Sequence, residues 1–352
     1  MTSPLLLTGS SILRDDVLRL AAAAGVTPEV LDVDDTLPLA WGTADLVLVG
    51  ADAAERVALL RPPRRPGVHV VGPAPLPHEV FRAAVRFGAE DVAELPQSQS
   101  WLVEVLTDSL DGGAYPGRVV AVLGGSGGIG ASVLAAALAA TWGARGPTLL
   151  VDADPCGAGL ERVLGMERLH GTCWSGLGSA TGRISGRSLR EALPHRHGVG
   201  LLGWGGLARE PVPPFAVREV LSAAGRGHDA VVVDLPRQGD AAAEEILARA
   251  DDVLLVCGST LTAVAAAGRA VARLEGLAAR PHLVVREGGG LAPGELARAF
   301  GLPLVAVTRH QRGLEEALDL GAGPLHARRG SVARAARDVV ARLERDTPAV
   351  AA

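Results

Sequence analysis

A glycine-rich stretch that joins an apolar run to an alanine-rich run is the part of this sequence best suited to chemistry. The stretch reads Gly124-Gly125-Ser126-Gly127-Gly128-Ile129-Gly130-Ala131-Ser132. It follows a strand pattern at 118–123 and leads into a helical pattern at 130–142. A loop in this position presents backbone N–H groups and the positive end of the helix dipole to an anion. The sequence therefore predicts a phosphate-binding loop.

The loop fits two phosphate-binding patterns. Read as G-x-G-x-x-G, it uses Gly125, Gly127 and Gly130, and Asp152 ends the next predicted strand about 20 residues on, as in dinucleotide-binding sites. Read as G-x-x-x-x-G-K-[ST], the same segment has Ala131 in the position of the lysine and a serine in that of the Mg²⁺ ligand. The first pattern predicts NAD(P) binding, and the second predicts ATP or ADP with Mg²⁺.

Carboxylates at the ends of two further predicted strands complete the candidate site. Asp152 ends a strand at 148–152 and is followed closely by Asp154, and Asp234 ends a strand at 230–234. Carboxyl ends of parallel strands meet at one edge of a sheet, so we expect these side chains near the loop. Ser132 and Asp234 are the candidate Mg²⁺ ligands, because that ion prefers oxygen ligands. Each aspartate could instead cap the turn that follows its strand.

The pattern of apolar runs predicts an α/β protein with two domains. In the first domain, 1–113, strands at 5–7, 45–49 and 68–71 alternate with helices at 13–24 and 78–88, and a helix at 101–110 precedes a turn-rich segment. The second domain, 114–352, is predicted to contain a doubly wound, mostly parallel sheet of about seven strands. Its strands are expected at 118–123, 148–152, 199–202, 230–234, 252–257, 282–285 and 304–307, and its helices at 130–142, 215–225, 240–250, 262–277, 293–300 and 331–345.

Composition excludes several classes of protein. Apolar residues make up 48% of the 352 residues, which suits two packed domains. The net charge of −5 argues against a nucleic-acid-binding surface over the whole protein, although it leaves a local basic patch open. All 34 basic residues are arginine, so no mechanism here can use a lysine, and the Tyr-x-x-x-Lys pair of short-chain dehydrogenases is absent. Three scattered cysteines and no apolar run of about 20 residues predict a cytoplasmic protein without a spanning helix.

Four segments in order resemble the MinD/ParA family of P-loop ATPases. They are the glycine loop and residues 149–155, 231–236 and 250–256. In that family the loop reads K-G-G-x-G-K-[ST], and both lysines are replaced here, by Ser126 and Ala131. Their loss removes charge-assisted contacts to phosphate worth roughly 1.5–3 kcal/mol each. The resemblance therefore implies weak nucleotide binding, or an empty loop kept for helix–sheet packing, rather than hydrolysis by the family mechanism.

Within that family the sequence resembles the CpaE/TadZ-type proteins, which include septum-site-determining (Ssd-type) proteins. The run from Asp152 to Leu160 and the tail 302–331 carry this likeness. So does the N-terminal domain, because residues 84–91 resemble the segment before the last strand of a response-regulator receiver, a flavodoxin-like domain.

The receiver-like domain departs from a working receiver at each phosphorylation position. Thr8-Gly9-Ser10 stands in place of the acidic pair, Gly50 in place of the phospho-acceptor aspartate, and Leu95-Pro96 in place of Lys-Pro. Asp52 lies near the acceptor position but out of register with it. The resemblance thus implies an interaction module rather than a phosphorylation switch.

The family likeness implies a non-catalytic or weakly nucleotide-binding spatial regulator or scaffold. Such a protein would form a homodimer and position a Flp/Tad-type pilus or secretion apparatus, or the division septum, by recruitment to the membrane or cell pole. The final helix, at 331–345, has a narrow apolar face and is expected to pack in the core rather than on a membrane. Three alternatives stay open: an active MinD/ParA-type ATPase with an unconventional phosphate loop, an NAD(P)-binding Rossmann protein, and a ParA-like DNA-binding protein.

Overall fold

The computed structural model describes residues 3–33, 40–65, 67–109, 117–177, 184–205, 211–276 and 278–346. The chain divides into two compact units. One comprises Met1–Pro116 and the short piece Ser185–Arg187, and the other comprises the remaining residues from Gly117. The domain boundary predicted near residue 114 lies outside the described residues and stays a prediction.

The N-terminal unit contains a five-stranded parallel sheet in the order β2-β1-β3-β4-β5, which is the order of flavodoxin-like folds. The strand at 29–31 is short and half exposed, and the sequence did not predict it. The strands are β1 (Leu5–Leu7), β2 (Glu29–Leu31), β3 (Val47–Gly50), β4 (Val68–Pro73) and β5 (Asp91–Leu95), and the helices are α1 (Ser11–Ala23), α2 (Ala40–Thr43), α3 (Ala54–Leu60), α4 (His78–Phe87) and α5 (Gln99–Asp108).

Alternation along β1 shows why this sheet is covered on both faces. Leu5 and Leu7 lie in the core cluster beneath α2, α3 and α4, whereas Leu6 lies in the cluster beneath α1 and α5. All three side chains are fully buried. An uninterrupted apolar strand is what a parallel sheet with helices on both faces requires.

The C-terminal unit contains an eight-stranded sheet in the order β13-β12-β11-β6-β10-β7-β9-β8. Every neighbouring pair is parallel except β8 and β9, so the predicted mostly parallel sheet is confirmed. The sequence did not predict the two-residue edge strand β8. The strands are β6 (Arg118–Gly124), β7 (Thr148–Asp152), β8 (His195–Arg196), β9 (Val199–Leu202), β10 (Ala230–Leu235), β11 (Asp252–Gly258), β12 (Arg280–Glu287) and β13 (Leu304–Arg309).

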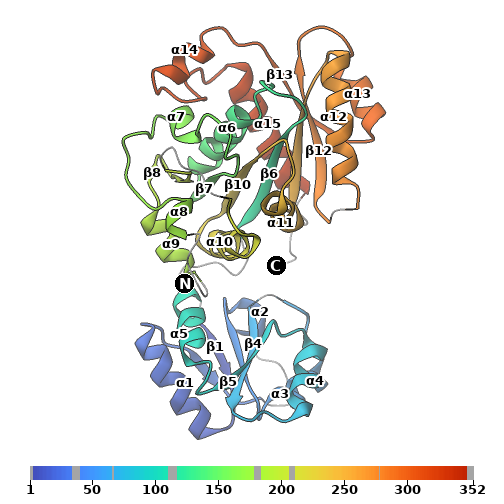
Figure 1. Ribbon diagram of the computed structural model, residues 1–352. Coiled ribbons are helices and arrows are strands. Elements are labelled where there is room, and N and C mark those ends of the chain that lie inside the picture. The colour runs from blue at the N-terminus through green and yellow to red at the C-terminus, as the bar shows by residue number, and fades with distance from the viewer. Residues whose placement is uncertain are drawn as a thin grey trace. The chain divides into compact units, whose positions relative to one another are not determined.

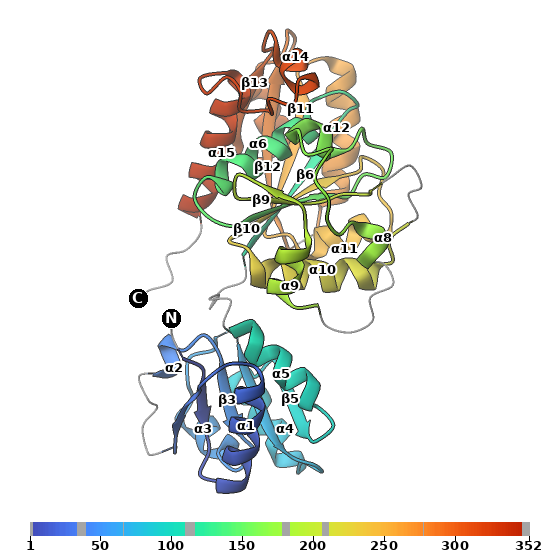
Figure 2. The same cartoon turned by 90° about the vertical axis from the view of Figure 1, so that its left-hand side faces the viewer.

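Helices cover both faces of this second sheet (Figures 1 and 2). Val120 and Val122 of β6 face the cluster built with α6 and α15, and Ala121 faces the cluster built with α10, α11 and α12. Short helices that the sequence did not predict add to each layer. The helices are α6 (Ala131–Gly143), α7 (Leu160–Leu164), α8 (Trp174–Leu177), α9 (Gly186–Ala192), α10 (Pro214–Gly227), α11 (Ala241–Arg249), α12 (Leu261–Leu274), α13 (Pro293–Phe300), α14 (Leu314–Asp319) and α15 (Ser331–Asp346).

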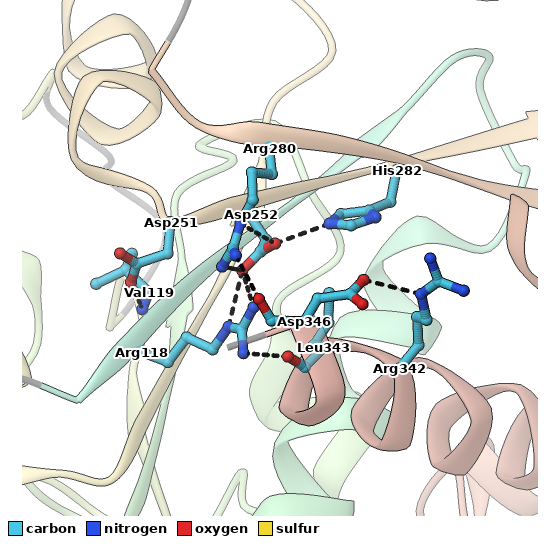
Figure 3. Close-up of polar contacts among 9 residues, drawn as sticks. All are labelled: Arg118, Val119, Asp251, Asp252, Arg280, His282, Arg342, Leu343 and Asp346. Atoms are coloured by element: carbon cyan, nitrogen blue, oxygen red, sulfur yellow. Dashed lines mark hydrogen bonds and ion pairs between the residues drawn. The ribbon is translucent and has the colours of Figure 1, made fainter. Parts of the chain in front are cut away.

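A buried carboxylate holds the amino ends of three neighbouring strands, β12, β11 and β6, together (Figure 3). Asp252 at the start of β11 is fully buried and accepts hydrogen bonds from Arg118 Nε at 2.7 Å, Arg280 Nη2 at 3.2 Å and His282 Nε2 at 2.8 Å. Burial alone would raise the pKa of Asp252. The hydrogen bonds from His282 and Arg118, with the arginine charges, hold that pKa below its ordinary value instead.

The same arginines attach the last helix to the sheet. Arg118 Nη1 donates to the backbone carbonyl of Leu343 at 2.5 Å, and Arg280 Nη1 donates to that of Asp346 at 2.9 Å. The apolar face of α15 packs against α6 and β13, which confirms the expectation of core packing. No helix in the described ranges is long and apolar enough to span a membrane. The buried residues of α15 are Val332, Ala333, Ala335, Ala336, Val339, Val340 and Leu343.

Candidate nucleotide site

The glycine loop forms the connection that the sequence predicts. Strand β6 ends at Gly124, and α6 begins at Ala131 with Gly130 as its N-cap. Gly128 and Gly130 have φ values of 68° and 92°, a region that glycine enters without a steric penalty. The loop is fixed to the neighbouring strand by a hydrogen bond of 2.9 Å from Gly125 N to the carbonyl of Val256. Its backbone therefore forms the strand-to-helix loop that the sequence predicts.

Different physical constraints explain why the individual loop positions are glycine. A Cβ on Gly125 would lie 2.8 Å from the Cβ of Ala267, so this glycine allows α12 to approach the sheet. Gly127 has no positive φ, and a Cβ added there would meet no atom within 4 Å. Packing accounts for Gly125 and backbone conformation for Gly128, but neither accounts for Gly127. Open space beside that backbone is what a bound ligand would need.

The parallel register places two of the predicted aspartates side by side. Asp234 of β10 is paired with Asp152 of β7, and the two residues are only 4% and 2% exposed. Burial raises the pKa of Asp234 to about 7, a hydrogen bond from the Ser132 hydroxyl opposes the rise, and the charges of Asp152 and Asp154 add to it. The two predicted Mg²⁺ ligands, Ser132 and Asp234, thus lie near each other and line the same cavity.

Asp152 and Asp154 differ in their access to the site. One carboxylate oxygen of Asp152 accepts from the N–H of Asp154 at 3.1 Å, and the other accepts from the N–H of Leu160 at 3.1 Å. Asp152 therefore caps the turn that leads into α7, the alternative role considered for it. Asp154 accepts from the N–H of Cys156 at 2.9 Å, and both of these residues line the cavity described next.

A cavity of about 970 Å³ opens in front of the loop. Most of the predicted site residues line it, whereas Gly125 and Asp152 do not. No group of three or more His, Cys, Asp or Glu side chains that could hold a metal is found in the described part of the chain. The predicted residues that line the cavity are Ser126, Gly127, Gly128, Ile129, Gly130, Ala131, Ser132, Asp154 and Asp234.

Three arginines that the sequence did not assign to the site also line this cavity. They are Arg237, which follows β10, Arg286 near the end of β12, and Arg309 at the end of β13. Arg286 Nη1 donates a hydrogen bond of 3.1 Å to the carbonyl of Gly128. The sequence could have assigned Arg286 and Arg309 to the site. The segments 282–285 and 304–307 are predicted as parallel strands, and both end at the same edge of the sheet as the glycine loop.

The N-terminal unit has its own cluster at the carboxyl ends of β1 and β3. Asp52 is out of register with β3, yet its carboxylate accepts from the Thr8 hydroxyl and from the N–H of Gly9, each at 2.8 Å. A Cβ on Gly50 would lie 2.3 Å from the nearer Asp52 oxygen. The Asp52 side chain therefore occupies the space that a side chain at position 50 would need.

Comparison with known proteins places the whole chain in a family. Residues 7–116 match the family profile described as the Rv3660c-like, CheY-like N-terminal domain. The protein Rv3660c of Mycobacterium tuberculosis is 36% identical over 341 residues, which cover 95% of this chain and 95% of that protein. The chain belongs to the Rv3660c-like family. This match confirms the predicted receiver-like N-terminal domain.

The solved structures similar to this Rv3660c-like protein have the predicted second fold. The cell division ATPase MinD of Pyrococcus furiosus is 21% identical with a TM-score of 0.55, over 65% of this chain and 99% of MinD. A ParA family ATPase of Chlorobium tepidum is 20% identical with a TM-score of 0.54, over 64% of this chain and 98% of that one. The predicted combination of a receiver-like domain with a MinD/ParA-like domain is therefore confirmed.

The strand order does not fit the dinucleotide pattern. In a Rossmann fold the strand that follows the glycine loop and its helix lies directly beside the first strand. Here β10 lies between β6 and β7 and pairs with both. Asp152 therefore ends a strand that is not adjacent to the loop strand, and its carboxylate is used by the following turn. The NAD(P)-binding alternative has no support in this arrangement.

Proposed function

We propose that this protein is a spatial regulator or scaffold whose MinD/ParA-like domain binds nucleotide weakly and does not hydrolyse it by the family mechanism. The observation that supports this proposal is the glycine loop, which connects a strand to a helix and has open space beside the backbone of Gly127. It has Ser126 and Ala131 where the family has lysines. A cradle of backbone N–H groups supports binding. Hydrolysis additionally needs cations where charge develops in the transition state.

The residues present fit a magnesium-bound nucleotide. The backbone of the loop, from Gly127 to Ser132, would hold the phosphates, and the oxygens of Ser132 and Asp234 would bind Mg²⁺. Bound Mg²⁺ would supply positive charge beside the phosphates. A cation next to Asp234 would also favour its ionised form and offset the effect of burial.

Positioning of a cell-surface or division machine is the finer part of the proposal. One similar solved structure is the septum site-determining protein MinD of Pyrococcus horikoshii complexed with Mg-ADP, and another is a MinC:MinD cell division complex of Aquifex aeolicus. By the resemblance to MinD/ParA and CpaE/TadZ-type proteins, the protein forms a homodimer and binds components of a pilus, a secretion apparatus or the division septum. The receiver-like domain serves as an interaction module, since Asp52 is held by Thr8 and Gly9.

Binding and localisation together test this proposal. Wild-type protein titrated with Mg-ATP and Mg-ADP in a calorimeter should bind both, and Gly127→Ala should weaken binding because its methyl group enters the open space beside the loop. Gly268→Ala is the matched control, since its Cβ also meets nothing within 4 Å but lies on α12 outside the cavity. A fluorescent fusion in the native host should form foci at the pole or septum. Uniform fluorescence would contradict the positioning role.

A second candidate function, an ATPase with an unconventional phosphate loop, is favoured by one observation. The guanidinium of Arg286 reaches the loop from another strand, which supplies a cation where the loop itself has none. Steady release of phosphate from Mg-ATP, lost in Asp234→Ala, would establish this function instead.

A further inference from the structure

Arg286 lies beside the glycine loop although it belongs to a strand that is not adjacent to it. Strand β12 is separated from β6 by β11 in the sheet. Arg286 is partly buried near the carboxyl end of β12, and its Nη1 is 3.1 Å from the carbonyl oxygen of Gly128. A Cβ placed on Gly130, the N-cap of α6, would lie 3.7 Å from the same nitrogen. The guanidinium therefore lies at the amino end of α6, where the loop would receive phosphate.

The charge of Arg286 is not compensated by a carboxylate. In the ranges that the structure describes, no carboxylate oxygen lies within 4.0 Å of its guanidinium nitrogens, and its hydrogen bond goes to a neutral carbonyl. Arg309, on the same cavity, is paired with Glu287 at 2.6 Å. Arg237 is exposed on the segment after β10. Among these three arginines, Arg286 combines partial burial, contact with the loop and an unpaired charge.

We propose that Arg286 is the phosphate-binding cation of this site, taken from β12 in place of the two loop lysines, and that it makes the site selective for nucleoside di- and triphosphates over monophosphates. The inference rests on the proposed function, because it requires that nucleotide binds in the cavity. Without ligand, the guanidinium holds the carbonyl of Gly128. A phosphate oxygen accepts the same N–H more strongly, and the planar guanidinium can offer two donors at once. The arginine thus exchanges the loop carbonyl for the polyphosphate.

Nucleotides of different phosphate length test this role in the full-length protein. Binding of Mg-ATP, Mg-ADP and AMP is measured by calorimetry for wild type, Arg286→Gln, Arg286→Lys and two control variants. Arg286→Gln should weaken ATP and ADP at least about 10-fold, the size of one charge-assisted hydrogen bond, while AMP changes much less. Arg286→Lys, which keeps the charge but loses the planar fork, should be intermediate. Arg309→Gln should leave binding nearly unchanged, because Glu287 already compensates that charge.

The outcomes separate the inference from the function on which it rests. ATP binding by wild type that Arg286→Gln leaves unchanged would overturn the inference alone, as would a selective loss of binding in Arg237→Gln instead. An equal loss for ATP and AMP in Arg286→Gln would also overturn it, since that pattern indicates a displaced loop rather than a missing phosphate contact. Wild-type protein that binds none of the nucleotides would overturn both the inference and the nucleotide part of the proposed function.

Discussion

Replacement of Asp234 by asparagine should stabilise the ligand-free protein at alkaline pH. The pKa of this aspartate rises from 3.8 to about 7, chiefly because the carboxyl group is buried. The folded state therefore binds its proton more tightly than the unfolded state. The stability that the neutral form contributes is fully present below about pH 4 and is lost as the pH rises through 7. The asparagine side chain would keep an oxygen that can accept from Ser132 but carries no charge to bury.

The size of the expected gain in stability follows from the pKa shift of Asp234. A difference of about 3 units corresponds to about 4 kcal/mol when the group is ionised in both states. By the same relation, ionisation of Asp234 lowers the free energy of unfolding by about 4 kcal/mol at pH 8 and by about 1.5 kcal/mol at pH 5. Asp234→Asn removes this cost, so its advantage over wild type should grow by about 2.5 kcal/mol between pH 5 and pH 8. For a unit of this size, that growth is about 5–10 °C in melting temperature.

Thermal unfolding at the two pH values, with EDTA and no nucleotide, measures this difference. Three of the five tryptophans, Trp142, Trp174 and Trp204, lie in the unit that contains Asp234, so tryptophan fluorescence reports mainly on that unit. Asp319→Asn, an exposed residue at the end of α14, removes the same charge from the surface and should show no such growth with pH. An Asp234→Asn variant that is no more stable than wild type at pH 8 would refute the reasoning, because it would mean that the ionised carboxylate has favourable partners.

Three further predictions concern other parts of the chain. Asp252→Ala should lower the free energy of unfolding at pH 7 by about 3–5 kcal/mol, because it leaves Arg118 without its buried partner; a urea titration showing less than about 1 kcal/mol would contradict this. Asp52→Ala should destabilise the N-terminal unit by about 1–3 kcal/mol through loss of two hydrogen bonds, measured in a urea titration. Gly127→Ala should change stability by less than about 0.5 kcal/mol while weakening nucleotide binding, so a large loss of stability would argue for a packing role.

The fold could be predicted from the sequence because most of its strands are continuous apolar runs. A parallel sheet covered on both faces needs continuous apolar strands, and runs such as 118–123 and 230–234 have that pattern. Strand β2 was not predicted because Glu29–Leu31 is short and half exposed at the edge of the sheet. Strand β8 was not predicted because it has only two residues, both exposed, and two residues show no hydrophobic periodicity.

The candidate site was predictable in its backbone and less so in its side chains. The glycine spacing determines the loop, and the register of β7 and β10 brings Asp152 beside Asp234. Sequence alone could not show that the oxygens of Asp152 are used by the turn before Leu160. It also could not show how far the long side chain of Arg286 reaches across β11 to the loop. Strand order and rotamer, rather than spacing, decide both points.

A single-turnover experiment with labelled Mg-ATP and protein in excess tests most directly whether the loop holds nucleotide that it does not hydrolyse. The sample is passed through a filter that retains protein, and the retained label is identified after minutes and after hours. We expect label to be retained with the protein and recovered as intact ATP. Retention of no label would contradict nucleotide binding, and recovery of ADP with released phosphate would show that the protein is an ATPase despite having no lysine.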